Sequence, residues 1–68
     1  MEFKLKSEFI ELDNLLKVLS IAASGAGAKQ IIRAEEVKVN GEIETRIRRK
    51  LCAGDFVELR RERINIIK

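Results

Sequence analysis

Histidine, proline, tryptophan and tyrosine are absent from this 68-residue chain, and cysteine occurs once. Without histidine or paired cysteines, neither the common catalytic dyads nor the nitrogen- or sulfur-ligated metal sites can be assembled. A single cysteine also cannot form an internal disulfide, which favours a reducing compartment. We therefore expect no enzymatic activity, no cofactor and no metal site.

Aromatic residues are scarce, since three phenylalanines make up the whole 4%. Stacking of unpaired bases on aromatic side chains is the usual way to hold single-stranded RNA, so that mode is disfavoured here. The sequence also contains no signal-peptide pattern and no apolar run long enough to span a membrane. We expect a cytoplasmic protein with an aliphatic core and no membrane contact.

The length suits one compact domain, so residues 1–68 are predicted to form a single unit. Its net charge of +3 is unevenly distributed. Residues 1–44 carry six basic and eight acidic side chains, a net of −2, whereas residues 45–68 carry eight basic and three acidic, a net of +5. This asymmetry is typical of a polyanion-binding face on an otherwise ordinary surface.

Apolar spacing predicts two short helices after an extended stretch over residues 1–10. Leucines recur at intervals of three and four over residues 12–20, which places one apolar stripe on a first helix. Ser24 is a good N-cap for a second helix, which we expect to end near Glu35 or Glu36. A tight turn should join the two helices.

The rest of the chain reads as short strands. Asn40-Gly41 between alternating apolar residues predicts a two-residue hairpin with a type I′ turn. A turn over residues 53–55 precedes two closing strands, 56–59 and 64–67, joined by a charged loop. The predicted fold class is α+β, with two short helices packed on a small, mostly antiparallel sheet.

The predicted core is aliphatic, and Cys52 is interpreted as a further small buried hydrophobe rather than a nucleophile. The core residues are Leu12, Leu15, Leu16, Leu19, Ile21, Ala28, Ile31, Ile32, Val37, Val39, Ile43, Leu51, Val57, Leu59, Ile64 and Ile66.

The order of these short motifs resembles the S-four RNA-binding domain, or alpha-L motif. The resemblance covers residues 10–59, about three quarters of the chain, and is strongest to the short free-standing bacterial branch. It implies a non-catalytic domain that binds structured RNA, such as ribosomal or transfer RNA, in ribosome assembly or translation. The matching segments are Leu12-Asp13 with Leu16, Ser24 with Ala28, Ile31 and Ile32, Val37-Lys38-Val39-Asn40-Gly41, and Ala53-Gly54-Asp55 with Val57 and Leu59; the branch is indicated by Leu15-Leu16-Lys17, Ser24 to Lys29 and Glu44 to Leu51.

The sequence departs from the broader family at three positions. Glu11 and Gly25 stand where that family usually has arginine, so its RNA contacts cannot be transferred residue for residue, and Lys29 is a candidate substitute. Glu35 stands where the family usually has glycine. We therefore expect the second helix to end without a glycine-capped left-handed turn.

Two segments are predicted to contact phosphate. The start of a helix presents unpaired N–H groups and partial positive charge, so Ser24 and Gly25 form a candidate anion site with Lys29 beside it. Residues 46–50 hold three arginines and a lysine with no acidic partner expected, and arginine binds phosphate oxygens in pairs. The alternatives are that Ser24 merely caps a helix and that the basic run is a solvated face. Pairing of its guanidinium groups with Glu42, Glu44 and Glu58 would also remove the polyanion-binding face. The full set of candidate RNA-binding residues is Lys17, Ser24, Gly25, Lys29, Arg33, Lys38, Arg46, Arg48, Arg49 and Lys50.

Other functions stay open at this point. Arg60, Arg61 and Arg63 form a second basic cluster that suits RNA contact and a solvated loop equally well. Two helices joined by a tight turn could also belong to a duplex DNA-binding module, and an exposed sheet edge could serve a protein-interaction adaptor. The expected partner is structured RNA, with the ribosome as the assembly that would contain it, and we expect the chain to be a monomer.

Overall fold

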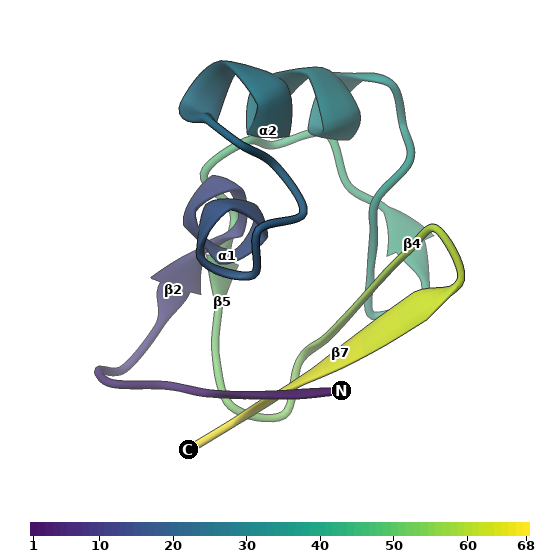
Figure 1. Cartoon of the computed structure of the whole chain (residues 1–68). Coiled ribbons are helices and arrows are strands. Elements are labelled where there is room, and N and C mark those ends of the chain that lie inside the picture. Colours follow the sequence, from purple (N-terminus) through teal and green to yellow (C-terminus); the bar gives the residue numbers. More distant parts are fainter.

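The computed structural model describes all residues from Met1 to Lys68. Two helices, α1 (Leu12–Val18) and α2 (Gly25–Arg33), pack together on one side of a sheet, and they cross steeply, since α1 is seen end-on where α2 lies across the view (Figure 1). The five-stranded sheet has the order β1-β7-β6-β3-β4. The predicted fold class, two helices on a mostly antiparallel sheet, is confirmed. Neither helix has the length and apolar character needed to cross a membrane.

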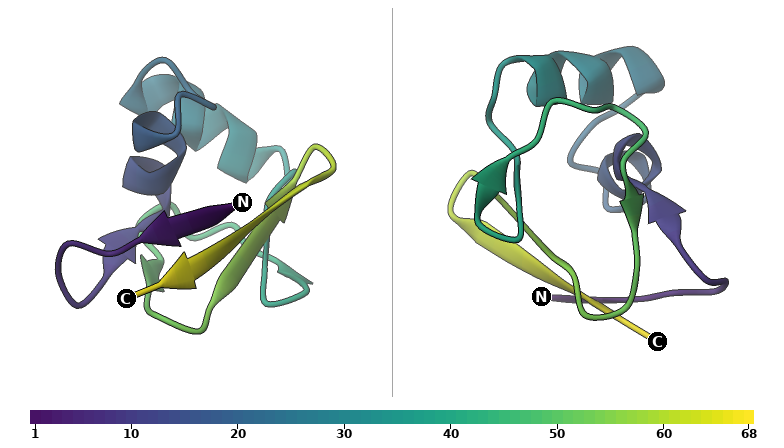
Figure 2. Two further views of the ribbon diagram at one scale, coloured as in Figure 1. Left: turned by 60° about the horizontal axis from the view of Figure 1, so that its bottom comes forward. Right: turned by 180° about the vertical axis from the view of Figure 1, so that it is seen from behind.

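The sheet is antiparallel except at one edge. Its strands are β1 (Glu2–Lys4), β3 (Lys38–Val39), β4 (Glu42–Ile43), β6 (Phe56–Leu59) and β7 (Glu62–Ile67). Strand β1 runs parallel to β7, so the amino-terminal residues close the sheet beside the carboxyl-terminal ones (Figure 2). A separate antiparallel pair is formed by β2 (Ile10–Glu11) and β5 (Lys50–Leu51), directly before α1.

The local sequence explains how both helices end. Helix α1 stops at Val18, two residues before the predicted end, and α2 stops at Arg33, two to three residues early. Beyond α2, Glu35 has a φ of 62° and donates its N–H to Ile32, while Glu36 donates to Ile31. This bond pattern satisfies carbonyls of the last turn and requires a left-handed residue. We expected no left-handed turn at the end of α2, because Glu35 stands where the family usually has glycine. That expectation was wrong, because Glu35 itself adopts the left-handed conformation.

Both hairpins use two-residue turns. Asn40 and Gly41 have φ angles of 54° and 89°, which confirms the predicted type I′ turn between β3 and β4. The charged loop predicted over residues 60–63 was too long. Leu59 pairs with Glu62, so only Arg60 and Arg61 form the turn. Their φ angles of 48° and 67° are positive, although neither is glycine.

The core fills the space between the helices and the sheet, and all but three of its predicted members are buried. Leu19 and Ile21 are half-buried against it, and Ile43 is 53% exposed. The register explains Ile43: it lies opposite Lys38, and residues directly opposite each other share a face, here the outer one. Cys52 is exposed as well, since it follows the inward-facing Leu51 and enters a turn, so its assignment to the core was wrong.

Candidate nucleic-acid interface

Residues 46–50, which we call the basic loop, are fixed against the start of α1. The N–H groups of Leu12 and Asp13 donate to the carbonyls of Arg49 and Ile47, at 2.9 and 3.1 Å. The first amides of a helix have no partner within the helix, so these bonds satisfy them with loop carbonyls. Backbone hydrogen bonds therefore hold the basic loop in place. Because the same bonds occupy the first amides of α1, these amides cannot bind an anion.

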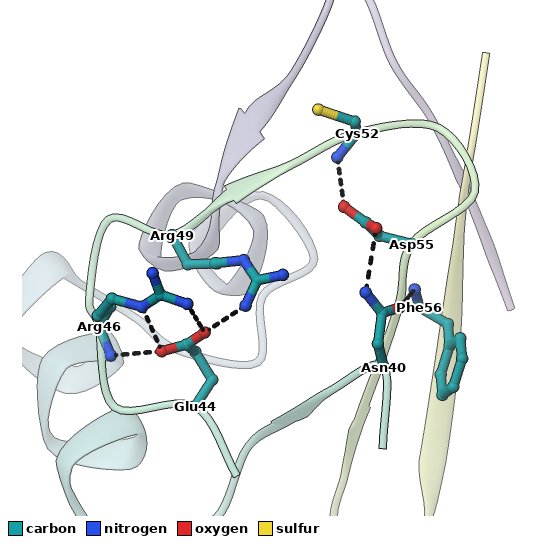
Figure 3. Close-up of polar contacts among 7 residues, drawn as sticks. All are labelled: Asn40, Glu44, Arg46, Arg49, Cys52, Asp55 and Phe56. Atoms are coloured by element: carbon teal, nitrogen blue, oxygen red, sulfur yellow. Dashed lines mark hydrogen bonds and ion pairs between the residues drawn. The ribbon is translucent and has the colours of Figure 1, made fainter. Parts of the chain in front are cut away.

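A buried carboxylate lies inside this loop. Glu44, whose side chain is 8% exposed, accepts the backbone N–H of Arg46 at 2.9 Å and its Nε and Nη2 groups at 3.0 and 2.9 Å (Figure 3). Arg49 Nη1 donates to the same carboxylate at 2.6 Å. The expectation that the basic run has no acidic partner was wrong, because Glu44 binds two of its arginines.

The pKa of Glu44 reflects this environment. Hydrogen bonds from the Arg46 side chain are the largest cause that lowers it from its ordinary 4.5 to about 2; burial opposes them, and the Arg46 backbone and the Arg49 side chain add to the lowering. The same contact with Glu44 raises the pKa of Arg46. Both partners therefore stay charged across the physiological range.

The basic loop still carries excess positive charge at its surface. The Arg46 and Arg48 side chains are 71% and 79% exposed, whereas that of Arg49 is 28% exposed. Arg48 lies 3.9 Å from Glu11, a separation at which an exposed ion pair contributes little. The ammonium of Lys50 lies 4.8 Å from the centre of the Phe9 ring. Among these four cations, Arg46 and Arg49 form ion pairs with Glu44 and Arg48 forms one with Glu11.

The start of α2 has the form expected of an anion site. Ser24 has extended backbone angles, and its hydroxyl accepts the Gly27 N–H at 3.2 Å, which confirms it as the N-cap. The amides of Gly25 and Ala26 have no acceptor within the protein. A Cβ atom built on Gly25 would meet nothing within 4 Å, so the helix start is open to a ligand.

The start of α2 and the basic loop face one groove. Figure 2 shows, in the view from behind, the segment between β4 and β5 running alongside α2. The space between them is a groove of about 650 Å³. It is lined by Asp13, Gly25, Ala26, Lys29, Gln30, Arg33, Ile47 and Arg48. Arg48 also lines an adjoining hollow with Arg46, Arg49 and Lys50, so the two cationic segments form one continuous surface.

Two candidate residues lie apart from this groove. Lys17 is exposed in the last turn of α1 and does not line it. Lys38 lines a different hollow, on the sheet, together with Arg60, Arg61 and Arg63 and the carboxylates of three glutamates. Arg60 is already paired there with Glu36 at 3.2 Å, and the Arg63 guanidinium lies 3.9 Å from the centre of the Phe56 ring.

Five residues of the site were not among the candidates: the apolar Ala26 and Ile47, which line the groove, and the polar Gln30, Glu44 and Asp13. Gln30 follows Ala26 by four residues and precedes Arg33 by three, so all three share one face of α2. This spacing could have indicated Gln30. Glu44 stands two residues before Arg46, and alternate residues of an extended segment share a side. Asp13 places a carboxylate in the groove, with Oδ1 accepting the Asn14 N–H at 2.9 Å. Nothing in the sequence pattern indicated Asp13.

Two proteins of known name are similar to this chain in sequence. The Escherichia coli (strain K12) protein named "Putative RNA-binding protein YbcJ" is 39% identical over 62 residues, which cover 91% of this chain and 89% of that one. The Bacillus subtilis (strain 168) protein named "Probable ribosome maturation protein RlbA" is 42% identical over 53 residues, 78% of this chain and 75% of that one.

The fold matches as well. The solution structure of Escherichia coli YbcJ, described as revealing an alpha-L motif involved in RNA binding, superposes with a TM-score of 0.73. The match has 38% sequence identity and covers 98% of this chain and 86% of the other. A family model described as the S4 domain matches residues 3–67. The chain therefore belongs to the S4 domain family, as its motifs predicted.

Proposed function

We propose that this chain is a non-catalytic RNA-binding protein that holds structured RNA, of the ribosomal or transfer RNA kind, through phosphate contacts. The contacts come from the start of α2 and from the basic loop. The proposal places the protein in the cytoplasm and gives it a part in ribosome assembly or translation. It acts as a single chain that positions RNA and performs no chemistry on it.

The observation that carries this proposal is the shared groove. Free amides of Gly25 and Ala26, together with Lys29, border it from α2, and the exposed guanidinium of Arg48 borders it from the basic loop. Helix amides and guanidinium groups are both donors that bind phosphate oxygens. Because neither set carries base-specific geometry, the groove suits recognition of backbone shape, which is how proteins hold folded RNA.

The relatives support both parts of the proposal. YbcJ is named for RNA binding and its structure is described in those terms, which favours RNA as the polyanion. The name of RlbA refers to ribosome maturation, which favours ribosomal RNA over other structured RNAs. Duplex DNA is disfavoured because, of the Asn, Gln and Arg side chains that read base edges in a major groove, α2 offers only Gln30 and Arg33.

The test is a titration followed by fluorescence anisotropy, with a labelled RNA hairpin and a DNA duplex of equal length, repeated from 50 to 400 mM salt. We expect tighter binding to RNA and a slope of log K against log salt of roughly −3 to −5, because about four to six phosphates are engaged. A flat salt dependence would reject the electrostatic groove. Equal affinity for the DNA duplex would reject RNA as the specific partner.

The biological part needs a second experiment. Ultraviolet crosslinking of the full chain in cells, followed by sequencing of the attached RNA, should recover ribosomal or transfer RNA. Recovery of no RNA, together with protein partners that survive nuclease and high salt, would instead identify a protein-interaction adaptor.

A further inference from the structure

We propose that Glu44 is a positioning residue of the RNA site, which holds the Arg46 and Arg49 guanidinium groups in the orientation that receives phosphate. This inference rests on the proposed function. It makes an unusual claim about charge, because removing a carboxylate from a polyanion-binding face ordinarily strengthens binding. Here the removal of the Glu44 charge should weaken it.

The geometry of Arg46 is the main observation. Its Nε and Nη2 groups donate to the Glu44 carboxylate at 3.0 and 2.9 Å, so one edge of the planar guanidinium is occupied. A guanidinium carries five N–H donors, and the edge formed by Nη1 and Nη2 retains donors for a second acceptor. With 71% of the side chain exposed, that second edge is accessible to a phosphate that binds in a forked pair.

Arg49 and the loop backbone complete the arrangement. Arg49 donates to Glu44 at 2.6 Å while its own carbonyl accepts the Leu12 N–H, so one residue ties the carboxylate to the start of α1. The Arg46 backbone N–H also donates to Glu44 at 2.9 Å. Two side chains and the loop backbone thus converge on one buried anion, which fixes the loop before any ligand arrives.

Two opposing effects decide the sign of the Glu44 contribution. Ordering a long side chain at an interface weakens binding by roughly 2- to 12-fold for each residue, so pre-ordering two arginines is worth roughly 5- to 150-fold if the two effects add in free energy. The repulsion between Glu44 and a phosphate is screened by water and salt, and its removal should tighten binding by only about two-fold. Positioning therefore outweighs repulsion.

Glu42 provides a matched control for this comparison. Its carboxylate is exposed, forms no ion pair and borders the same hollow as Glu44, Arg46 and Arg49. The variants Glu44→Gln and Glu42→Gln each remove one negative charge with almost no change of shape. Once the lost repulsion is set against the lost ordering, we expect Glu44→Gln to weaken binding of an RNA hairpin by roughly 3- to 75-fold, whereas Glu42→Gln should tighten it by about two-fold.

The salt dependence and a double-mutant cycle separate positioning from stability. All basic residues remain in Glu44→Gln, so the salt slope should match that of the wild type, whereas Arg46→Gln should reduce it by about one. In an Arg46→Gln/Arg49→Gln background, Glu44→Gln should change the affinity by less than about two-fold. An equal loss in both backgrounds would assign Glu44 a purely structural role and overturn the inference.

A measurement on the unaltered protein covers the case in which Glu44→Gln does not fold. The Arg46 Nε–H should give a slowly exchanging nuclear magnetic resonance signal that persists when the RNA hairpin binds. Loss of this signal on binding would mean that phosphate replaces Glu44, which would overturn the inference. If the wild type binds no RNA, the proposed function itself fails. If the wild type binds and both glutamine variants bind more tightly, only the inference fails.

Discussion

Asn40 and Asp55 are joined side chain to side chain, with Asn40 Nδ2 donating to Asp55 Oδ1 at 3.1 Å across 15 positions of the chain (Figure 3). Asn40 Oδ1 accepts the Phe56 N–H, and Asp55 Oδ2 accepts the Cys52 N–H. Hydrogen bonds between Asn40 and Asp55 therefore join the β3–β4 turn to the turn that precedes β6. The two motif segments that contain Asn40 and Asp55 are thus linked by a direct side-chain hydrogen bond.

The first prediction concerns this connection. Asp55→Ala should lower the free energy of unfolding by roughly 1–2 kcal/mol, because two hydrogen bonds to a charged acceptor are lost at a partly exposed site. Urea denaturation followed by circular dichroism measures it. Asn40→Ala and the double variant complete a cycle, in which we expect a coupling of at least about 0.5 kcal/mol. Strictly additive losses would show that the side-chain bond contributes nothing.

The second prediction concerns the contribution of Glu44 to folding stability at low pH. The pKa of Glu44 is about 2 in the folded protein and its ordinary value is 4.5, so between these pH values the unfolded chain binds a proton that the folded chain does not. Its contribution to stability is therefore fully present above about pH 5 and is lost as the pH falls toward 2. Urea denaturation from pH 7 to pH 2 should show Glu44→Gln less stable than wild type near pH 7, with the difference vanishing near pH 2. A constant difference would contradict the assignment.

Local patterns explain why much of the fold could be predicted from the sequence. The leucine stripe of α1, the Ser24 cap and the Asn40-Gly41 turn are each determined by residues close together in the chain, so spacing and turn chemistry were sufficient. The two arginines of the β6–β7 turn could not be placed in this way. Nothing at Arg60 or Arg61 favours positive φ, and the register between β6 and β7 imposes it on them.

The site shows the same division. The start of α2 and the basic loop were each recognisable as cationic, but their meeting in one groove depends on backbone bonds between the loop and the start of α1. Lys38 was selected by charge alone, and its strand register directs it to the other hollow. Glu44 was misjudged because the two-residue spacing that places it beside Arg46 has meaning only if the segment is extended, and the sequence does not show that this irregular loop is extended there.

The third prediction follows from the β6–β7 turn. Arg61 has a φ of 67°, a conformation that glycine adopts without steric cost, so Arg61→Gly should stabilise the protein by roughly 0.5–1 kcal/mol. Arg61 lies outside the groove, so the affinity for an RNA hairpin and its salt slope should remain those of the wild type. A weaker affinity together with a reduced slope would show that the second basic cluster contacts RNA.

The fourth prediction restores an arginine of the broader family. Space around Gly25 is open, so Gly25→Arg should fit without displacing a neighbour. It should raise the free energy of unfolding by up to about 1 kcal/mol, because glycine disfavours a helix. The added charge at the groove should make the salt slope steeper by about one and tighten RNA binding. Unchanged RNA affinity in a stably folded variant would mean that phosphate does not approach the start of α2.

The fifth prediction compares cations inside and outside the groove. Lys29 and Arg48 line it from α2 and from the basic loop, whereas Lys38 is equally cationic but lies on the sheet. Lys29→Gln and Arg48→Gln should each weaken RNA binding and reduce the magnitude of the salt slope by about one, since each removes one phosphate contact. Lys38→Gln makes the same change of charge and should leave the slope unaltered. Because long-range attraction depends on net charge alone, equal losses in all three variants would mean that RNA senses the overall field of the protein and has no bound position in the groove.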